Sequence, residues 1–224
     1  MIKNIQKLPS LQREIDKIKQ DLILLGAMVE QSLHCSIQAL NNQDLEVAKQ
    51  VIDKDDSIDI KEVEIEEECL KILALYQPVA VDLRYIIATL KVNNDLERIG
   101  DLAVNIAKSI KYLIEGVNVK PFKELMKSSK IVQQMLKMSL DSFIKLDVDL
   151  ANSILIEDDK VDDIHRKITK KVISKISSDQ VNAEQWMSIL TVSRYLERAA
   201  DHTTNIAEDI LYLVEGNIRR HTYK

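Results

Sequence analysis

Glycine and proline are scarce in this chain of 224 residues, which contains four glycines and three prolines. Average proteins contain about 7% glycine and about 5% proline, and β-rich chains need turn residues about every ten positions. No glycine or proline stands between Pro121 and Gly216. This scarcity excludes a β-rich or α/β chain and predicts long helices.

Cysteine and extended apolar segments are scarce as well. Cys35 and Cys69 are the only cysteines and have no CxxC spacing, so we expect two reduced, buried thiols in a cytoplasmic protein. The longest apolar run, from Leu22 to Val29, is far shorter than the roughly 20 residues of a transmembrane helix. The N-terminal residues 1–17 are polar and do not resemble a secretory signal peptide. We therefore expect no membrane span.

The charge balance also narrows the possible partners. The chain carries 31 basic and 36 acidic residues, a net charge of −5. A dedicated nucleic-acid-binding protein is expected to carry an excess of basic residues, so no nucleic acid is expected as a partner. Hydrophobic residues make up 46% of the chain and charged residues 30%, which is typical of a globular protein and excludes intrinsic disorder.

Apolar residues recur at helical spacing in six segments. Pro78 is expected to end the second helix, and Gly116 and Gly216 are expected to end the third and the sixth. The predicted helices cover approximately residues 10–40, 45–76, 81–115, 121–146, 148–176 and 182–215.

The six helices fall into two similar sets of three. Residues 96–98 and 196–198 both read Leu-Glu-Arg, and residues 105–107 and 205–207 both read Asn-Ile-Ala, at a shift of 100 residues. A shift of 103 residues aligns the acids of the second helix with those of the fifth. We therefore predict an all-α protein of two three-helix bundles with internal pseudo-symmetry, formed by residues 1–119 and 120–224.

Acidic residues are repeated together with the apolar pattern. Glu97 and Asp101 are four residues apart, so they lie on one face of a helix, separated by roughly 40°. That face also carries Ile86, Leu90 and Val104. Carboxylates on a partly apolar face are costly unless they are paired, protonated or bound to a metal.

Each repeat contains two such acid pairs, one on its second helix and one on its third. The four pairs are Asp55 with Asp59, Glu97 with Asp101, Asp158 with Asp162, and Glu197 with Asp201. Because consecutive helices of a three-helix bundle are antiparallel neighbours, the two pairs of a repeat can face each other. Oxygen ligands of this kind suit Mg²⁺, Ca²⁺, Mn²⁺ or iron better than a structural zinc ion.

Two other interpretations of these acids remain open at this level. The acids of the second helix continue through Glu62 and Glu66, as they would on a solvated face, and Arg98 and Arg198 could pair with acids across helices.

A metal-dependent enzyme or a metal-storage bundle of the ferritin type is the alternative function. Asp162 and His165 have the spacing of a di-iron motif, but Glu62 stands at the position corresponding to His165. His202, next to Asp201, is either part of a site or a surface residue. No catalytic motif is present, so we do not expect an enzyme.

A family resemblance rests on three motifs. Residues 77–84 read QPVAVDLR, residues 97–101 read ERIGD, and residues 197–201 read ERAAD. Together they closely resemble the PhoU family of bacterial phosphate-uptake regulators, and the similarity extends from about Leu11 to Gly216.

The resemblance implies a cytoplasmic, commonly homodimeric protein that negatively regulates phosphate uptake and the phosphate-starvation response. Such a protein links the ATPase subunit of the phosphate ABC transporter to a membrane sensor histidine kinase, so it reaches the membrane only through its partners. Some members bind multinuclear iron or other metal clusters, and others contain no metal. The cofactor expected here is therefore multinuclear iron, or else zinc, manganese or magnesium, or no metal. By motif match, the metal ligands here would be Asp55, Asp59, Glu97, Asp101, Asp158, Asp162, Glu197 and Asp201.

The chain departs from the family pattern in its second repeat. That repeat has ERAAD where ERIGD is the commoner form, so the two sites are not expected to be equivalent. It also has no counterpart of QPVAVDLR, which confines any role of Asp82 and Arg84 to the first bundle. Those two residues are either a favourable helix-start acid and an ion-paired arginine, or partner contacts.

Overall fold

The computed structural model describes residues 9–114 and 119–216, and these residues contain helices and no strand. In chain order the helices are α1 (Pro9–Asn42), α2 (Leu45–Asp53), α3 (Asp55–Tyr76), α4 (Ala80–Ile114), α5 (Lys123–Lys145), α6 (Val148–Ser178), a short 3₁₀ turn (Gln180–Asn182) and α7 (Ala183–Glu215). The predicted all-α class is confirmed. The expected end of the third helix at Gly116 lies outside the described residues.

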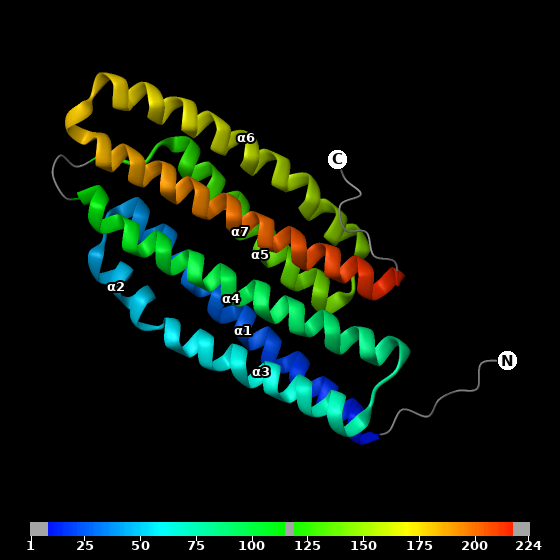
Figure 1. Cartoon of the computed structure of the whole chain (residues 1–224). Coiled ribbons are helices and arrows are strands. Elements are labelled where there is room, and N and C mark those ends of the chain that lie inside the picture. Colours follow the sequence, from blue (N-terminus) through cyan, green and yellow to red (C-terminus); the bar gives the residue numbers. More distant parts are fainter. Residues whose placement is uncertain (1–8, 115–118, 217–224) are drawn as a thin grey trace.

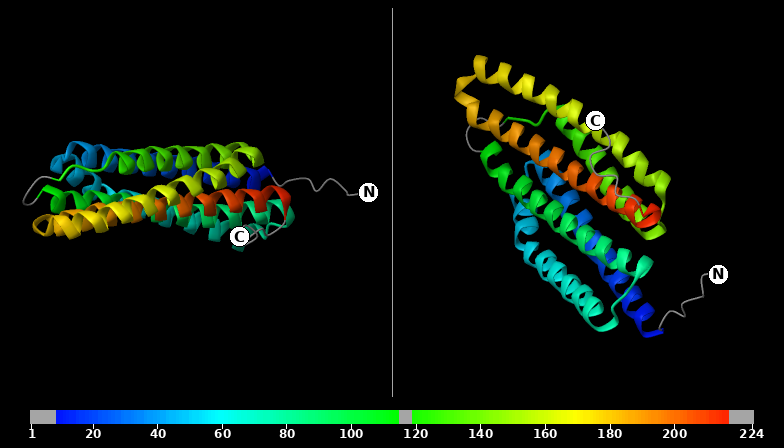
Figure 2. Two further views of the ribbon diagram at one scale, coloured as in Figure 1. Left: turned by 90° about the horizontal axis from the view of Figure 1, so that it is seen from above. Right: turned by 45° about the vertical axis from the view of Figure 1, so that its right-hand side comes forward.

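The helices form two three-helix bundles that lie side by side (Figure 1). One bundle contains α1, α4 and the consecutive helices α2 and α3, and the other contains α5, α6 and α7. The bundles meet where α4 packs antiparallel to α7 and where α1 packs against α5, while α3 and α6 lie at opposite edges of the molecule (Figure 2). The predicted tandem arrangement is confirmed. The predicted boundary at residue 119 falls in the connection between α4 and α5.

The core is formed by the apolar stripes that the sequence predicts. On α1, Leu22, Leu25 and Val29 are fully buried, and Ile86 and Val104 are buried on α4. A helix that buries such a stripe against two neighbours needs no strong intrinsic helix propensity, because tertiary packing supplies most of its stability. Among the described helices, none combines the length and the apolar character needed to cross a lipid bilayer.

The turn between the first and second helix of each bundle has the same construction in both repeats. Gln43 and Leu146 have φ values of 55° and 54°, so both occupy the left-handed region. The following residues, Asp44 and Asp147, cap the next helix, and their carboxylates accept backbone N–H groups at 2.9–3.1 Å. The internal repeat is therefore visible in backbone geometry as well as in sequence.

The predicted helix over residues 45–76 is interrupted at Lys54, which separates α2 from α3. Lys54 has φ −94° and ψ −5°, and its carbonyl accepts both the backbone N–H and the hydroxyl of Ser57, at 3.1 and 2.6 Å. These bonds form a tighter turn than the α-helical one. The corresponding helix of the second bundle, α6, is continuous.

The QPVAVDLR segment forms the turn from α3 to α4. Pro78 follows the end of α3 as predicted, and Gln77 and Ala80 both have positive φ values, 46° and 51°. Asp82 lies in the first turn of α4, where a negative charge is favourable. The Nε atom of Arg84 is buried and has no hydrogen-bond partner among the residues described.

Candidate functional site

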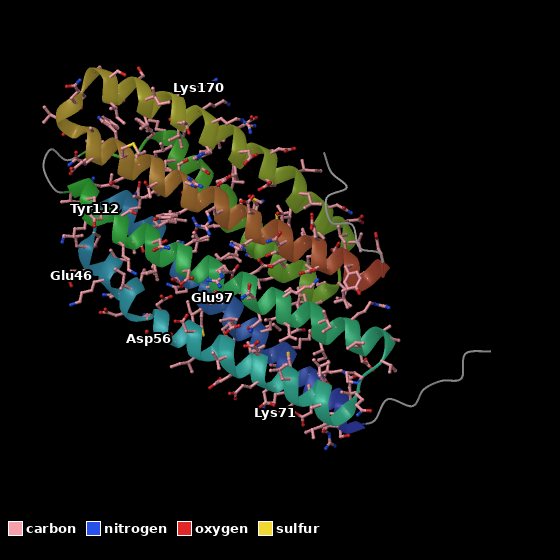
Figure 3. The ribbon with its side chains drawn as sticks, in the orientation of Figure 1. Glu46, Asp56, Lys71, Glu97, Tyr112 and Lys170 are labelled. Atoms are coloured by element: carbon pink, nitrogen blue, oxygen red, sulfur yellow. The ribbon has the colours of Figure 1, made fainter. Side chains whose placement is uncertain are left out.

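The first acidic cluster lies between α3 and α4, which pack against each other. Asp55 and Asp59 occupy the start of α3, and Figure 3 places Glu97 midway along α4. Asp101 follows Glu97 by four residues on the same helix, about one turn. The glycine between the α4 acids brings these helices close together, because a Cβ atom at Gly100 would lie 3.3 Å from Cγ2 of Ile58. The two acid pairs of the first repeat are therefore on facing helices.

Three of these carboxyl groups have a raised pKa. Burial is the largest cause of the raised pKa of Asp55, Asp59 and Glu97. The negative charge of Asp101 adds to that rise in all three, and Asp59 also acts on Asp55 and Glu97. Because charges act in this way only over short distances in a protein, the predicted residues of the first repeat are brought together.

Arg98 neutralises this cluster only in part. Its Nε atom lies 3.4 Å from Oε2 of Glu97, and one of its terminal nitrogens lies 3.4 Å from Oδ2 of Asp101. Both acids belong to the same helix as Arg98, so these contacts are not the inter-helix ion pairs considered from the sequence. Oδ1 of Asp55 and Oε2 of Glu97 are buried and accept no hydrogen bond from any part of the chain that the structure describes.

The second cluster lies between α6 and α7, and the pKa values of two of its acids are raised further than those of the first cluster. Burial, followed by the charges of Asp201 and Asp162, raises the pKa of Asp158 to about 7. Burial and Glu197 raise the pKa of Asp201 to about 6, although His202 and Arg198 partly offset that rise. Oδ1 of Asp158 is buried without a hydrogen-bond partner within residues 9–114 and 119–216. The four predicted residues of the second repeat are therefore also close together.

Each cluster is extended by a polar pair that sequence reasoning missed. In the first bundle the amide of Asn93 donates to the backbone oxygen and to Oε1 of Glu62, at 2.9 and 3.0 Å. In the second bundle Nδ1 of His165 lies 2.9 Å from the hydroxyl of Ser193. The repeat shifts align Glu62 with His165 and Asn93 with Ser193, so the correspondence was present in the sequence although the residue types differ.

His202 belongs to the interface between the two bundles. Its Nδ1 atom lies 2.7 Å from Oδ1 of Asp95 on α4, and the amide of Asn205 donates to the same oxygen at 3.2 Å. Nearby, the ammonium of Lys91 donates to Oδ1 of Asp209 at 2.7 Å. These polar contacts join α4 to α7, so His202 serves the packing of the bundles as well as lying beside Asp201.

The clusters fit a hard cation in their chemistry but not in their present arrangement. All predicted ligand atoms are carboxylate oxygens, and three of them are buried without a hydrogen-bond partner among the described residues. The first cluster also borders a groove of about 370 Å³ lined by Glu62, Glu97 and Arg98. Among the residues that the structure describes, however, no three His, Cys, Asp or Glu side chains are grouped closely enough to hold a metal ion. Metal binding would require these side chains to rotate toward one another.

Comparison with known proteins identifies the fold and the family. Residues 22–110 and 125–210 each match the PhoU domain. The phosphate-specific transport system accessory protein PhoU homolog of Clostridium acetobutylicum is 37% identical over 91% of this chain and 93% of its own length, and the PhoU protein of Escherichia coli is 35% identical over 93% and 86%. The crystal structure of PhoU from Pseudomonas aeruginosa superposes with a TM-score of 0.89 at 36% identity, covering 92% of this chain and 99% of that one. The chain therefore belongs to the PhoU family.

Proposed function

We propose that this protein is a negative regulator of phosphate uptake and of the phosphate-starvation response. The observation that carries this proposal is its similarity, along nearly the whole chain, to proteins named as accessory proteins of the phosphate-specific transport system. The proposed regulator acts in the cytoplasm and works by binding other proteins rather than by catalysis.

The proposed partners are the ATPase subunit of the phosphate ABC transporter and a sensor histidine kinase, with a homodimer as the acting form. One end of the first bundle offers a surface suited to such contacts. At the α3–α4 turn, the apolar side chains of Leu75, Val79 and Val81 are 76%, 61% and 58% exposed. Clusters of exposed apolar side chains are typical of protein interaction sites. This location favours partner contact as the role of the QPVAVDLR segment.

The two acidic clusters are the proposed cation sites, with iron, zinc, manganese or magnesium as candidates. A bound cation would neutralise neighbouring carboxylates of the cluster, and it would fix the relative positions of α3 and α4 or of α6 and α7. Burial raises the pKa of Asp158 to about 7, and His165 stands where the first bundle has Glu62. The two sites are therefore expected to differ in occupancy.

The regulatory proposal is tested by deleting the gene in a strain that carries no second copy. Expression of phosphate-starvation genes in high-phosphate medium is expected to rise in the deletion strain and to fall again when the gene is restored. Normal repression in the deletion strain would contradict the proposal.

The partner and enzyme interpretations are separated by experiments on the purified protein. Co-purification under chemical cross-linking is expected to recover the transporter ATPase or the sensor kinase. Metal analysis of protein prepared without chelators, followed by an oxidase assay after iron loading, tests the alternative. Turnover that disappears in Asp55→Ala or Glu97→Ala would favour a metal-dependent enzyme over a regulator.

A further inference from the structure

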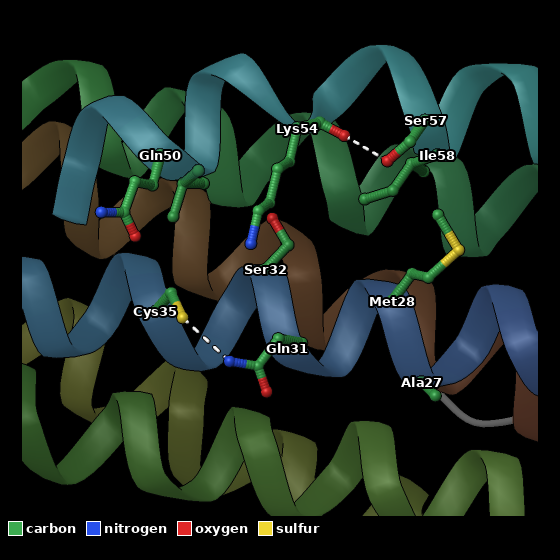
Figure 4. A pocket seen from close by; sticks show the side chains of 10 residues that line it. Ala27, Met28, Gln31, Ser32, Cys35, Gln50, Lys54, Ser57 and Ile58 are labelled. Carbon is green, nitrogen blue, oxygen red and sulfur yellow. Dashed lines mark hydrogen bonds between the residues drawn. The ribbon is translucent and has the colours of Figure 1, made fainter.

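A pocket of about 330 Å³ lies where α2 gives way to α3, between this junction and α1 (Figure 4). It is distinct from the acidic clusters, because none of the eight acids lines it and those clusters lie between α3 and α4 and between α6 and α7. Its wall is mostly apolar and includes Met28 from α1 and Val51 and Ile58 from the junction. Its volume is at the lower end of the range of ligand pockets, which is about 300–1,000 Å³.

Two polar groups in the pocket have no partner of their own. The hydroxyl of Ser32 is buried and makes no hydrogen bond to any described residue. Lys54 is the only charged residue that lines the pocket, and its ammonium forms no ion pair or hydrogen bond within the described ranges. Figure 4 shows the Lys54 side chain reaching from the junction toward α1 and the Ser32 hydroxyl pointing toward it. A buried polar atom without a partner is unfavourable, so an acceptor supplied by a ligand would be stabilised here.

The second bundle shows what a closed version of this region contains. At the shift of 103 residues, Met135 stands at the position of Ser32, and it is fully buried. Glu157 stands at the position of Lys54, and α6 passes through it without a break. Compared with the second bundle, the first bundle has the small Ser32 in place of a methionine and the cationic Lys54 in place of a glutamate. The small side chain of Ser32 leaves space for the pocket, and the ammonium of Lys54 makes it attractive to a negative charge.

We propose that this pocket binds a small organic anion with a short apolar body, of the size of a medium-chain carboxylate. The carboxylate accepts hydrogen bonds from the Lys54 ammonium and the Ser32 hydroxyl, and the apolar body packs against Met28, Val51 and Ile58. Charge-assisted hydrogen bonds of this kind are stronger than neutral ones, and they fix the orientation of the ligand.

Cys35 lines the same pocket and provides a built-in reporter. Its half-buried sulfur accepts a hydrogen bond from the amide of Gln31 at 3.1 Å. The other thiol, Cys69, is fully buried, and burial raises its pKa to about 12. Neutral iodoacetamide should therefore alkylate Cys35 alone in the folded protein, and Cys35→Ser should abolish the reaction.

The test measures the rate of this alkylation by mass spectrometry while octanoate is added below its micelle concentration. Octanoate is expected to slow alkylation at least about fivefold at saturation, because it covers the thiol. Octanol lacks the charge and inorganic phosphate lacks the apolar body, so neither should protect at the same concentration. Lys54→Ala is expected to weaken octanoate binding about tenfold, the usual effect of losing a charged hydrogen bond.

Two further variants separate binding from general effects on the fold. Lys49→Ala removes an exposed lysine of α2 that does not line the pocket, and it should leave protection unchanged. Ser32→Met introduces the residue of the second bundle and should abolish protection while the protein stays folded. Equal protection of the wild type by octanol and octanoate, or full protection of Lys54→Ala by octanoate, would overturn the proposal.

Discussion

At the scale of single residues, the carboxyl group of Asp158 is the most informative. Burial and the charges of Asp201 and Asp162 disfavour its ionised form in the folded protein and raise its pKa to about 7. Because the folded pKa lies above the unfolded value, the resulting contribution to stability is fully present below about pH 4 and is lost as the pH rises through about 7. The metal-free protein should therefore become more stable, through this residue, as the pH falls from 8 toward 5.

Asp158→Asn should stabilise the metal-free protein at pH 8, because it removes a partly buried charge surrounded by other acids. We expect an increase of about 1 kcal/mol in the free energy of unfolding, a value reduced for partial exposure to solvent. The increase should shrink at pH 5, where the wild-type carboxyl group is largely protonated. Urea unfolding at both pH values measures this, with Asp53→Asn, at an exposed position of the other bundle, as the control. Destabilisation by Asp158→Asn at pH 8 would show that the charge is compensated in the folded protein.

The acid pairs could be predicted from the sequence because they are repeated with the same spacing in both halves. The polar pairs beside them could not, because the repeats use different residue types, Asn93 with Glu62 and Ser193 with His165. The contact between His202 and Asp95 could not be predicted from the sequence either. Asp95 is far from His202 in the sequence, and the two meet only because the bundles pack together.

At the scale of elements, the helix ends are set by local signals that a sequence displays. Asp44 and Asp147 stand in polar corners and cap α2 and α6. Asp147→Ala or Asp44→Ala should each lower the free energy of unfolding by about 1 kcal/mol, the usual value of a lost N-cap.

Chemical denaturation of the two cap variants checks this prediction. Asp53→Ala, in the last turn of α2, removes an exposed acid that caps no helix, and it should change stability by less than about 0.5 kcal/mol. If Asp147→Ala behaves like this control, the cap contributes nothing to the second bundle.

The break between α2 and α3 at Lys54 is a feature that the sequence did not predict. No glycine or proline marks it, and the apolar pattern continues across it, so the sequence predicts one helix over residues 45–76. The interruption depends on the two hydrogen bonds from Ser57 to the Lys54 carbonyl and on how α2 and α3 each pack against α1. Serine can make such bonds in many contexts, so its presence alone does not predict a break.

At the scale of the whole molecule, the two bundles are joined by polar contacts as well as by apolar packing. The carboxylate of Asp209 is 8% exposed and receives the ammonium of Lys91 from the other bundle. Lys91→Met should lower the free energy of unfolding by about 2 kcal/mol, because the buried charge of Asp209 then loses a charged hydrogen bond.

A double-variant cycle measures this coupling directly. Lys91→Met should cost clearly less in an Asp209→Asn background than in the wild type, and the exposed Lys127→Met should cost little in either background. Equal costs of Lys91→Met in both backgrounds would mean that this ion pair does not contribute to the association of the bundles.

The tandem bundle fold could be predicted because duplication, helix length and the family motifs all indicate it. The packing of one bundle against the other could not be predicted, since the charged residues that join α4 to α7 differ between the repeats. In the other repeat, Thr191 stands at the position of Lys91, and Ser109 stands at the position of Asp209. Long-range packing of this kind leaves no periodic signal in a single sequence.

We propose that this protein needs its two acidic clusters, one in each bundle, to repress the phosphate-starvation response. The most direct measurement is reporter expression in high-phosphate medium in the deletion strain complemented with a variant carrying Asp59→Asn, Asp101→Asn, Asp158→Asn and Asp201→Asn. Neutral amides at these positions relieve charge repulsion, so the variant should remain folded and be produced at normal levels. We predict that it fails to restore repression, whereas the wild-type gene restores it. Full repression by the variant would contradict the account.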